Sequence, residues 1–114
     1  MLTTKETGLL LNIIKHCKKI IEKTNNLTKD QFENNEDVFQ IVCFNILQIG
    51  ELAKHFEPNF IATYNGVPWK KIKGMRDKVA HGYGTIKVER VWKIITLHIT
   101  PLLNYCQAIL KENN

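Results

Sequence analysis

The segment from Met75 to Tyr83 brings together three side chains that suit phosphate chemistry. Arg76 carries a permanent positive charge, His81 can transfer a proton near neutral pH, and Tyr83 offers a hydroxyl that can be modified. Cleavage of RNA without a metal needs little more than a base for the ribose 2′-hydroxyl, an acid for the leaving 5′-oxygen and a cation for the developing charge. We therefore take this segment as the candidate active site.

The spacing of Arg76 and His81 leaves two arrangements open. Five residues on a straight α-helix correspond to a rotation of about 140°, so the two side chains do not point at one spot. Either Gly82 and Gly84 end the helix and the histidine turns back, or the site is shared between two copies of the chain. An ordinary helix end with a capping histidine explains the same residues without any catalysis.

Asp77 and Tyr83 extend the candidate site along the same segment. Asp77 lies four residues before His81, a spacing at which an aspartate can orient the imidazole and favour its charged form. Tyr83 lies seven residues after Arg76, nearly two helical turns, so both can border one anion-binding surface.

Positive charge is concentrated around this segment. Between Lys70 and Lys93 eight basic residues accompany two acidic ones, a net charge of +6, whereas the whole chain carries +5. Such clustering favours an anionic partner, most commonly a phosphodiester. Lys73, Lys78 and Lys87 are the candidates for contacting it. A solvated helix face explains a lysine cluster equally well.

Four main helices and short helical turns must position these residues. Apolar residues recur at helical spacing, and capping residues mark where helices begin. The expected elements cover residues 4–24, 29–34, 38–56, 59–64, a segment from 67 into the candidate site, and 86–110. Because no segment alternates as a strand would, the sequence predicts an all-α bundle forming one domain over residues 1–114.

Three features of these helices bear on the candidate site. The middle helix is apolar on many sides, which predicts that neighbouring helices or a second subunit cover it. Within it, Gly50 is expected to permit close helix approach, and Glu51 is either a buried partner for a cation or an exposed glutamate. Near the other end of the chain, Pro101 either kinks the last helix or starts a new one after a cap at Thr100.

Composition excludes several other classes of protein. With 44% apolar and 24% charged residues the chain resembles a globular domain, and no apolar run is long enough to span a membrane. Its start lacks the features of a secretory signal, so the cytoplasm is the expected location. The three cysteines show no disulfide or zinc spacing and are expected to be buried thiols, and no other metal ligand set or cofactor motif stands out.

The residues from Gly74 to Tyr83 resemble the Arg-x4-His-x-Tyr signature of the HepT-like toxins, a branch of the HEPN superfamily. Blocks in the rest of the chain are similar to that family and occur in its order, so the resemblance covers nearly the whole sequence. These blocks span residues 27–32, 49–53, 67–72 and 91–94.

The resemblance implies a HEPN-type four-helix bundle and a homodimer that joins two Arg-x4-His motifs in a basic cleft. It implies a metal-independent endoribonuclease, the toxin of a type VII toxin–antitoxin system, acting on tRNA or mRNA. Its partner would be a minimal nucleotidyltransferase antitoxin that transfers AMP from ATP to the motif tyrosine.

Residue by residue, the resemblance implies that Arg76 stabilises phosphate, that His81 acts as acid or base and that Tyr83 accepts AMP. Asp77 occupies a position where members commonly carry Asn or Asp, and Glu51 becomes a candidate partner for Arg76. The alternative function is a non-catalytic HEPN module that binds nucleotide or assists a nucleotidyltransferase.

Overall fold

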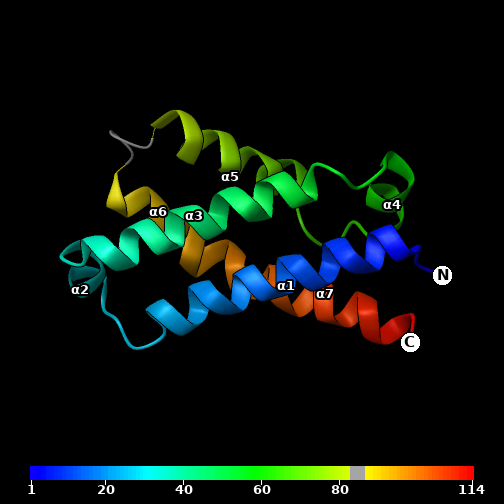
Figure 1. The fold of residues 1–114 in the computed structure, drawn as a ribbon, viewed down its shortest axis with the longest axis horizontal. Coiled ribbons are helices and arrows are strands. Elements are labelled where there is room, and N and C mark those ends of the chain that lie inside the picture. Colours follow the sequence, from blue (N-terminus) through cyan, green and yellow to red (C-terminus); the bar gives the residue numbers. More distant parts are fainter. Residues whose placement is uncertain (83–86) are drawn as a thin grey trace.

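The computed structural model describes residues 1–82 and 87–114, apart from the side chains of residues 81 and 82. Every regular element in this part of the chain is helical, which confirms the predicted all-α fold (Figure 1). The elements are α1 (Thr4–Thr24), α2 (Lys29–Glu33), α3 (Glu36–Ala53), α4 (Pro58–Thr63), α5 (Trp69–Gly82), α6 (Val88–Ile94), the π-helical turn η1 (Ile95–Ile99) and α7 (Thr100–Glu112). None of the described helices is both long and apolar enough to cross a bilayer.

Local capping sets the start of the first two helices. The Thr3 hydroxyl accepts a hydrogen bond from the Glu6 backbone N–H at 3.0 Å, and the Glu6 carboxylate accepts one from the Thr3 N–H at 2.9 Å. Thr28 and Gln31 exchange the same pair of bonds at the start of α2. Both predicted capping boxes are confirmed, because each satisfies N–H groups that a helix start leaves without partners.

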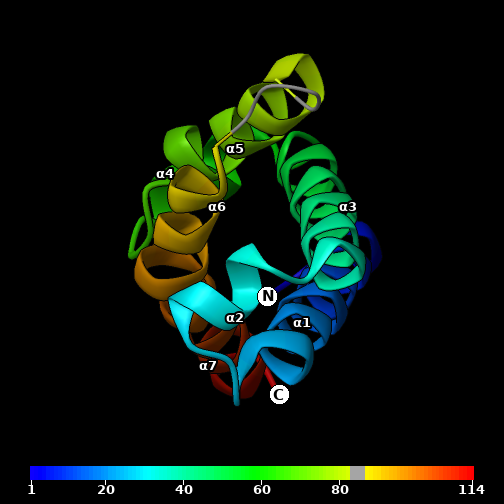
Figure 2. The ribbon, with the colours of Figure 1, turned by 90° about the vertical axis from the view of Figure 1, so that its left-hand side faces the viewer.

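Helix α3 lies between α1 and α5 and packs against both, while α1 also packs against α7. Figure 2 shows α1 and α3 side by side along one edge of the molecule, with no further described helix outside them. On that outer face the side chain of Phe44 is 56% exposed. Neighbouring helices therefore leave Phe44 uncovered, and cover by a second subunit stays a prediction.

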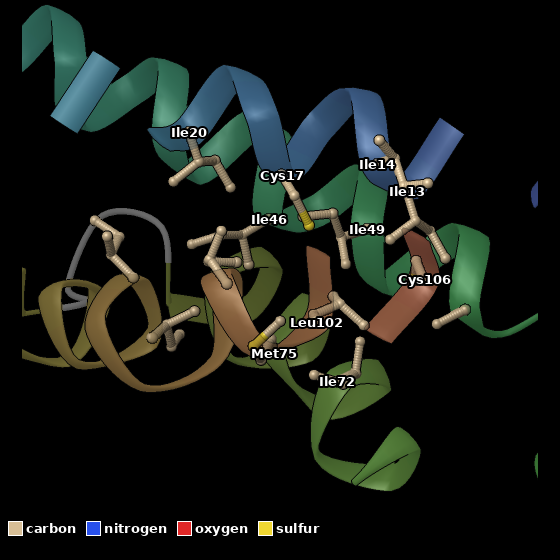
Figure 3. Packing of buried hydrophobic residues seen from close by; sticks show 14 of the residues in the cluster. Ile13, Ile14, Cys17, Ile20, Ile46, Ile49, Ile72, Met75, Leu102 and Cys106 are labelled. Atoms are coloured by element: carbon tan, nitrogen blue, oxygen red, sulfur yellow. The ribbon is translucent and has the colours of Figure 1, made fainter. Parts of the chain in front are cut away.

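The core is formed by one apolar stripe from each main helix. Figure 3 shows side chains of α1, α3, α5 and α7 meeting at its centre, among them Ile13, Ile46, Ile72 and Leu102. All three cysteines are buried there as free thiols. The prediction of buried thiols is confirmed, and burial raises the pKa of Cys43 to about 11 and that of Cys106 to about 12.

The segment between α4 and α5 is fixed by aromatic packing. Trp69 is 3% exposed, contacts the rings of Phe56 and Phe60, and donates a hydrogen bond from Nε1 to the Tyr64 carbonyl at 2.6 Å. Ile72 is buried one turn later. These contacts set where α5 begins, and α5 then runs without a break to Gly82.

Several predicted helix boundaries differ from the structure, and two of the differences have a local cause. Helix α3 ends at Ala53 rather than at residue 56, because the N–H groups of His55 and Phe56 bond to carbonyls three residues back and tighten the chain into turns. A cap at Thr100 is wrong, since its φ of −64° and ψ of −45° are helical. The chain instead passes from α6 through the wider π-helical turn into α7, which places Pro101, with no N–H to donate, in the first turn of α7.

The predicted start of the helix over 86–110 falls on residues that the structure does not describe. Lys87 is the residue preceding the first turn of α6. Thr85 and Ile86, which the sequence pattern places at this start, lie outside the described residues.

Candidate active site

The site begins with a close contact between α3 and α5 at Gly50. A Cβ atom at this position would collide with Cβ of Arg76 and would lie 3.1 Å from its backbone nitrogen and 3.2 Å from its Cα. Only a residue without a side chain lets the two helices come this close. The prediction that Gly50 permits close helix approach is confirmed, and the residue that packs against it is the candidate catalytic residue Arg76.

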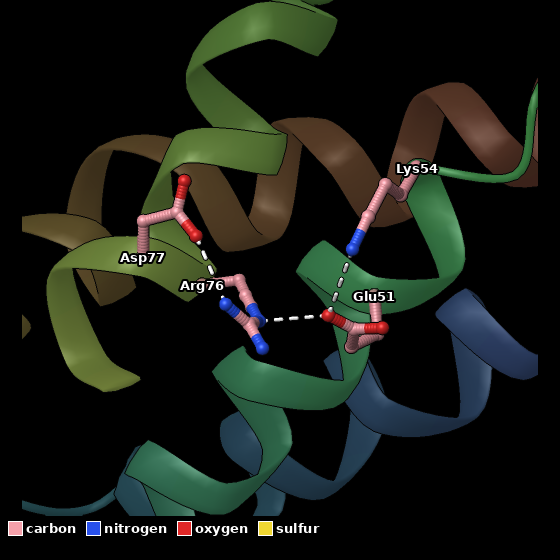
Figure 4. A network of polar contacts seen from close by, with 4 residues as sticks. All are labelled: Glu51, Lys54, Arg76 and Asp77. Atoms are coloured by element: carbon pink, nitrogen blue, oxygen red, sulfur yellow. Dashed lines mark hydrogen bonds and ion pairs between the residues drawn. The ribbon is translucent and has the colours of Figure 1, made fainter. Parts of the chain in front are cut away.

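Two carboxylates hold the Arg76 guanidinium, as Figure 4 shows. Its Nε lies 2.7 Å from Oε1 of Glu51, and its Nη1 donates a hydrogen bond to Oδ1 of Asp77 at 3.1 Å. The hydrogen bond to Asp77 and, next, the charge of Glu51 raise the pKa of Arg76 above its ordinary value. The remaining guanidinium N–H groups are free of these two contacts, and the side chain is 34% exposed. Arg76 is thus held in place while still able to meet an anion.

Glu51 combines both of the roles that the sequence left open. Its side chain is 40% exposed, but Oε1 itself is buried between the two cations Arg76 and Lys54, with Lys54 Nζ 3.6 Å away. The contact with Arg76 is a close charge pair and not a well-aligned hydrogen bond, because no N–H points along the 2.7 Å line. Glu51 therefore positions Arg76 mainly through charge.

His81 lies within α5, whose backbone continues unbroken to Gly82. The His81 side chain and the whole of Tyr83 fall outside what the structure describes. On a continuous helix the positions of Arg76 and His81 are separated by about 140° around the axis, whereas Asp77 and His81 share a face. The backbone is thus still helical at residue 81, so the positions of Arg76 and His81 are separated around the axis of α5 within one chain.

The three candidate RNA-contacting lysines lie on different parts of the fold. Lys73 is half-buried on α5, Lys78 is exposed on α5, and Lys87 is exposed at the start of α6. Lys87, Glu89, Arg90 and Lys93 line a shallow hollow of about 190 Å³. Burial, Lys71 and Lys78 together lower the pKa of His98 on η1, so Lys78 acts toward that helix.

Sequence reasoning missed two contacts at this site. The first is the contact between Lys54 and Glu51, which their three-residue spacing on a helix could have predicted. Asp77 was expected to serve His81, but its described partner is the adjacent Arg76, a contact that neighbouring positions on a helix do not suggest. No cluster of three or more potential metal ligands is found among the described residues.

Comparisons with known proteins agree on one family. A Methanocaldococcus jannaschii protein named "Putative RNase MJ0127" is 32% identical over 92% of this chain and 87% of its own length. "Putative RNase TTE0752" of Caldanaerobacter subterraneus is 28% identical over 90% of this chain and 92% of its own. "Probable ribonuclease HepT" of Thermococcus cleftensis is 33% identical over 55% of this chain and 57% of its own. No solved structure matches the chain.

The model of one protein family, described as "Ribonuclease HepT-like", matches residues 13–109. This range contains Gly50, Glu51, Arg76, Asp77 and His81. The chain therefore belongs to the HepT-like ribonuclease family, within the HEPN-type helical proteins.

Proposed function

We propose that this protein is an endoribonuclease that cleaves RNA without a metal ion. The observation that carries the proposal is Arg76 held against Gly50 by Glu51 and Asp77, in a chain that belongs to a ribonuclease family. A fixed cation that keeps free N–H groups suits the charge that develops on a phosphate during cleavage. His81, on the same helix, supplies a group that titrates near neutral pH.

The proposed reaction is attack by the ribose 2′-oxygen on the adjacent phosphorus. A histidine takes the 2′-hydroxyl proton as the new P–O bond forms, the P–O5′ bond breaks, and an acid gives a proton to the leaving 5′-oxygen. The products are a 2′,3′-cyclic phosphate and a 5′-hydroxyl. In a homodimer, His81 of each copy supplies one proton-transfer role, which accommodates the separation of Arg76 and His81 around α5.

The decisive experiment incubates the purified chain with RNA in the presence of a chelator. We expect cleavage that leaves a 2′,3′-cyclic phosphate, with a rate about 10²–10⁴-fold lower for His81→Ala. His55→Ala is the matched control, because His55 is exposed just beyond the end of α3. Equal rates for H81A and the parent chain would disprove the assignment. Nucleotide binding without any cleavage would favour the non-catalytic module.

We further propose that the chain is the toxin of a type VII toxin–antitoxin pair. A cognate minimal nucleotidyltransferase would join the Tyr83 hydroxyl oxygen to the α-phosphorus of ATP, releasing pyrophosphate. The added phosphate and nucleoside would repel RNA electrostatically and fill the space beside Arg76. Family membership and the Arg-x4-His-x-Tyr spacing in the sequence support this proposal.

Intact-mass measurement after coexpression with such a nucleotidyltransferase tests the modification. We expect AMP additions that disappear in Tyr83→Phe, with Tyr105→Phe as the control. An unmodified mass accompanied by full inhibition would replace covalent transfer with simple blocking of the site by the partner.

A further inference from the structure

A groove runs between α1 and α3; Figure 2 shows these two helices side by side. The volume of the groove is about 450 Å³. Seven residues line it, namely Lys15, His16, Lys19, Lys23, Ile41, Phe44 and Asn45. None of these seven is acidic, in contrast to the hollow at α6, which contains Glu89.

One wall of the groove is a row of cations. Lys15, Lys19 and Lys23 follow one another at four-residue intervals on α1, which spaces them by about 6 Å along the helix axis. None of the three lies within ion-pair distance of a carboxylate of the described residues. An unpaired row of this kind attracts a polyanion with regularly spaced charges.

The other wall offers an aromatic surface. Phe44 on α3 is 56% exposed, and Ile41 one turn before it is half-buried. The exposed face of the Phe44 ring is therefore available to stack on another planar group. A ring beside a row of lysines is the combination that binds single-stranded nucleic acid, because bases stack on the ring while cations meet the phosphates.

The floor of the groove carries a fixed polar pair. Asn45 is 5% exposed, and its Nδ2 donates to the Ile41 carbonyl at 2.7 Å. Its Oδ1 is therefore the acceptor in the 2.7 Å contact with His16 Nδ1, so this histidine nitrogen carries a proton. The other ring nitrogen of a neutral His16 is then an acceptor, which suits an N–H group on the edge of a base.

The groove and the candidate active site both include residues of α3. Phe44 and Glu51 are seven residues apart on α3, so they share a face and lie about 10 Å apart along the axis. Glu51 contacts Arg76. A strand with one phosphate at Arg76 can therefore place a neighbouring nucleotide on Phe44.

We propose that the α1–α3 groove binds the single-stranded part of the RNA next to the cleaved bond, with a base on Phe44 and phosphates along the three lysines. This rests on the proposed ribonuclease function and adds a binding site to it. A second copy of the chain is a poorer occupant, because a two-fold contact through this face would bring the lysine rows of both copies together.

Binding of a 2′-O-methyl oligouridine, measured by fluorescence anisotropy, tests the groove separately from catalysis. This probe lacks the 2′-hydroxyl and is not cleaved. We expect Phe44→Ala to weaken binding about tenfold. Leu97→Ala is the matched control, because Leu97 is 62% exposed on η1, and it should leave the affinity unchanged.

The lysine row is tested by the salt dependence of the same binding. Removing three phosphate contacts should lower the slope of log affinity against log salt by about 2 in the triple variant K15A/K19A/K23A. A control triple variant, K5A/K29A/K111A, loses the same charge from three other places and should keep the slope of the parent chain.

Three outcomes would overturn the groove assignment. The first is that both groove variants bind the probe as the parent chain does, and the second is that the control variants lose as much affinity as the groove variants. The third is that F44A converts a dimer to a monomer in light scattering, which would assign this face to a second copy. A parent chain that binds the probe through the groove but cleaves no RNA would disprove the ribonuclease proposal alone. Cleavage with parent-like binding by both groove variants would disprove the groove alone.

Discussion

The two flanks of α3 carry positive charge in opposite ways. On the α5 flank, Arg76 is packed against Gly50 and held by Glu51 and Asp77. On the α1 flank, the three groove lysines have no carboxylate partner among the described residues. A fixed cation stabilises charge at one defined point, whereas a mobile unpaired cation attracts charge over a region. The first suits a transition state and the second suits binding of the substrate.

The largest expected effect comes from removing the fixed cation. Arg76→Ala should lower the RNA cleavage rate at saturating substrate by about 10²–10³-fold, because it removes a preorganised charge from the reacting phosphate. Lys19→Ala, on the other flank, should leave that rate unchanged and weaken binding instead. Single-turnover cleavage rates and anisotropy titrations of both variants measure the two effects. If the two variants lose rate and affinity in the same proportion, the distinction between the flanks is wrong.

A second prediction concerns the helix contact that places Arg76. Gly50→Ala puts a methyl group into the backbone and Cβ of Arg76, so α5 must move. We expect a loss of about 1–3 kcal/mol in the free energy of unfolding from overpacking. Most of this range exceeds the gain of about 1 kcal/mol that alanine brings to a helix interior, so we expect a net loss of up to about 2 kcal/mol. Urea unfolding followed by circular dichroism measures the difference, and the cleavage rate should fall as well.

Gly74→Ala is the matched control for this contact. Gly74 also lies within a helix, but a Cβ at this position would meet nothing within 4 Å. Alanine there should stabilise the protein by about 0.5–1 kcal/mol through helix propensity alone. Stabilisation by both substitutions would mean that the α3–α5 approach at Gly50 is not tight.

Sequence reasoning was most successful where local chemistry decides the structure. The two capping boxes gave the starts of α1 and α2, and apolar spacing gave the core faces of the four main helices. Gly50 was correctly interpreted as a close-approach residue, but the sequence did not identify Arg76 as the residue that approaches it. That pairing depends on how two helices dock, which periodicity does not encode.

The same limit explains what was missed at the groove and at Pro101. Phe44 belongs to the apolar pattern of α3, and only the packed fold reveals that no described helix covers it. Pro101 has no N–H, so the sequence predicts that one helical hydrogen bond is missing there. It does not predict that the chain adapts to this through a π-helical turn before the proline. The individual residues were thus interpretable, whereas most of their tertiary partners were not; the pairing of Glu51 with Arg76, which the family resemblance implied, is the exception.

A smaller effect is expected from the charge that positions Arg76. Glu51→Gln keeps the size of the side chain and removes its charge, so the turnover rate should fall by no more than about fivefold, as for a half-exposed ion pair. KM should change little, because Glu51 acts on Arg76 and not on RNA. Steady-state cleavage kinetics separate the two quantities, and Glu51→Asp should restore part of the rate. A change confined to KM would instead make Glu51 a substrate-binding residue.

The smallest expected effect concerns His98 on η1 and the lysine charges near it. Burial first, and then the charges of Lys71 and Lys78, lower the pKa of His98 below its ordinary value of 6.5. The unfolded chain therefore binds this proton more readily, so His98 costs no stability above about pH 6.5 and lowers stability as the pH falls below it. His98→Asn should reduce this acid sensitivity in thermal unfolding curves. Removing a neighbouring cation with Lys78→Ala should raise the His98 pKa, measured by NMR, whereas Lys19→Ala on α1 should not. If Lys78→Ala left the His98 pKa unchanged, the exposed lysines would act only on bound polyanions and not on the protein's own titrating groups.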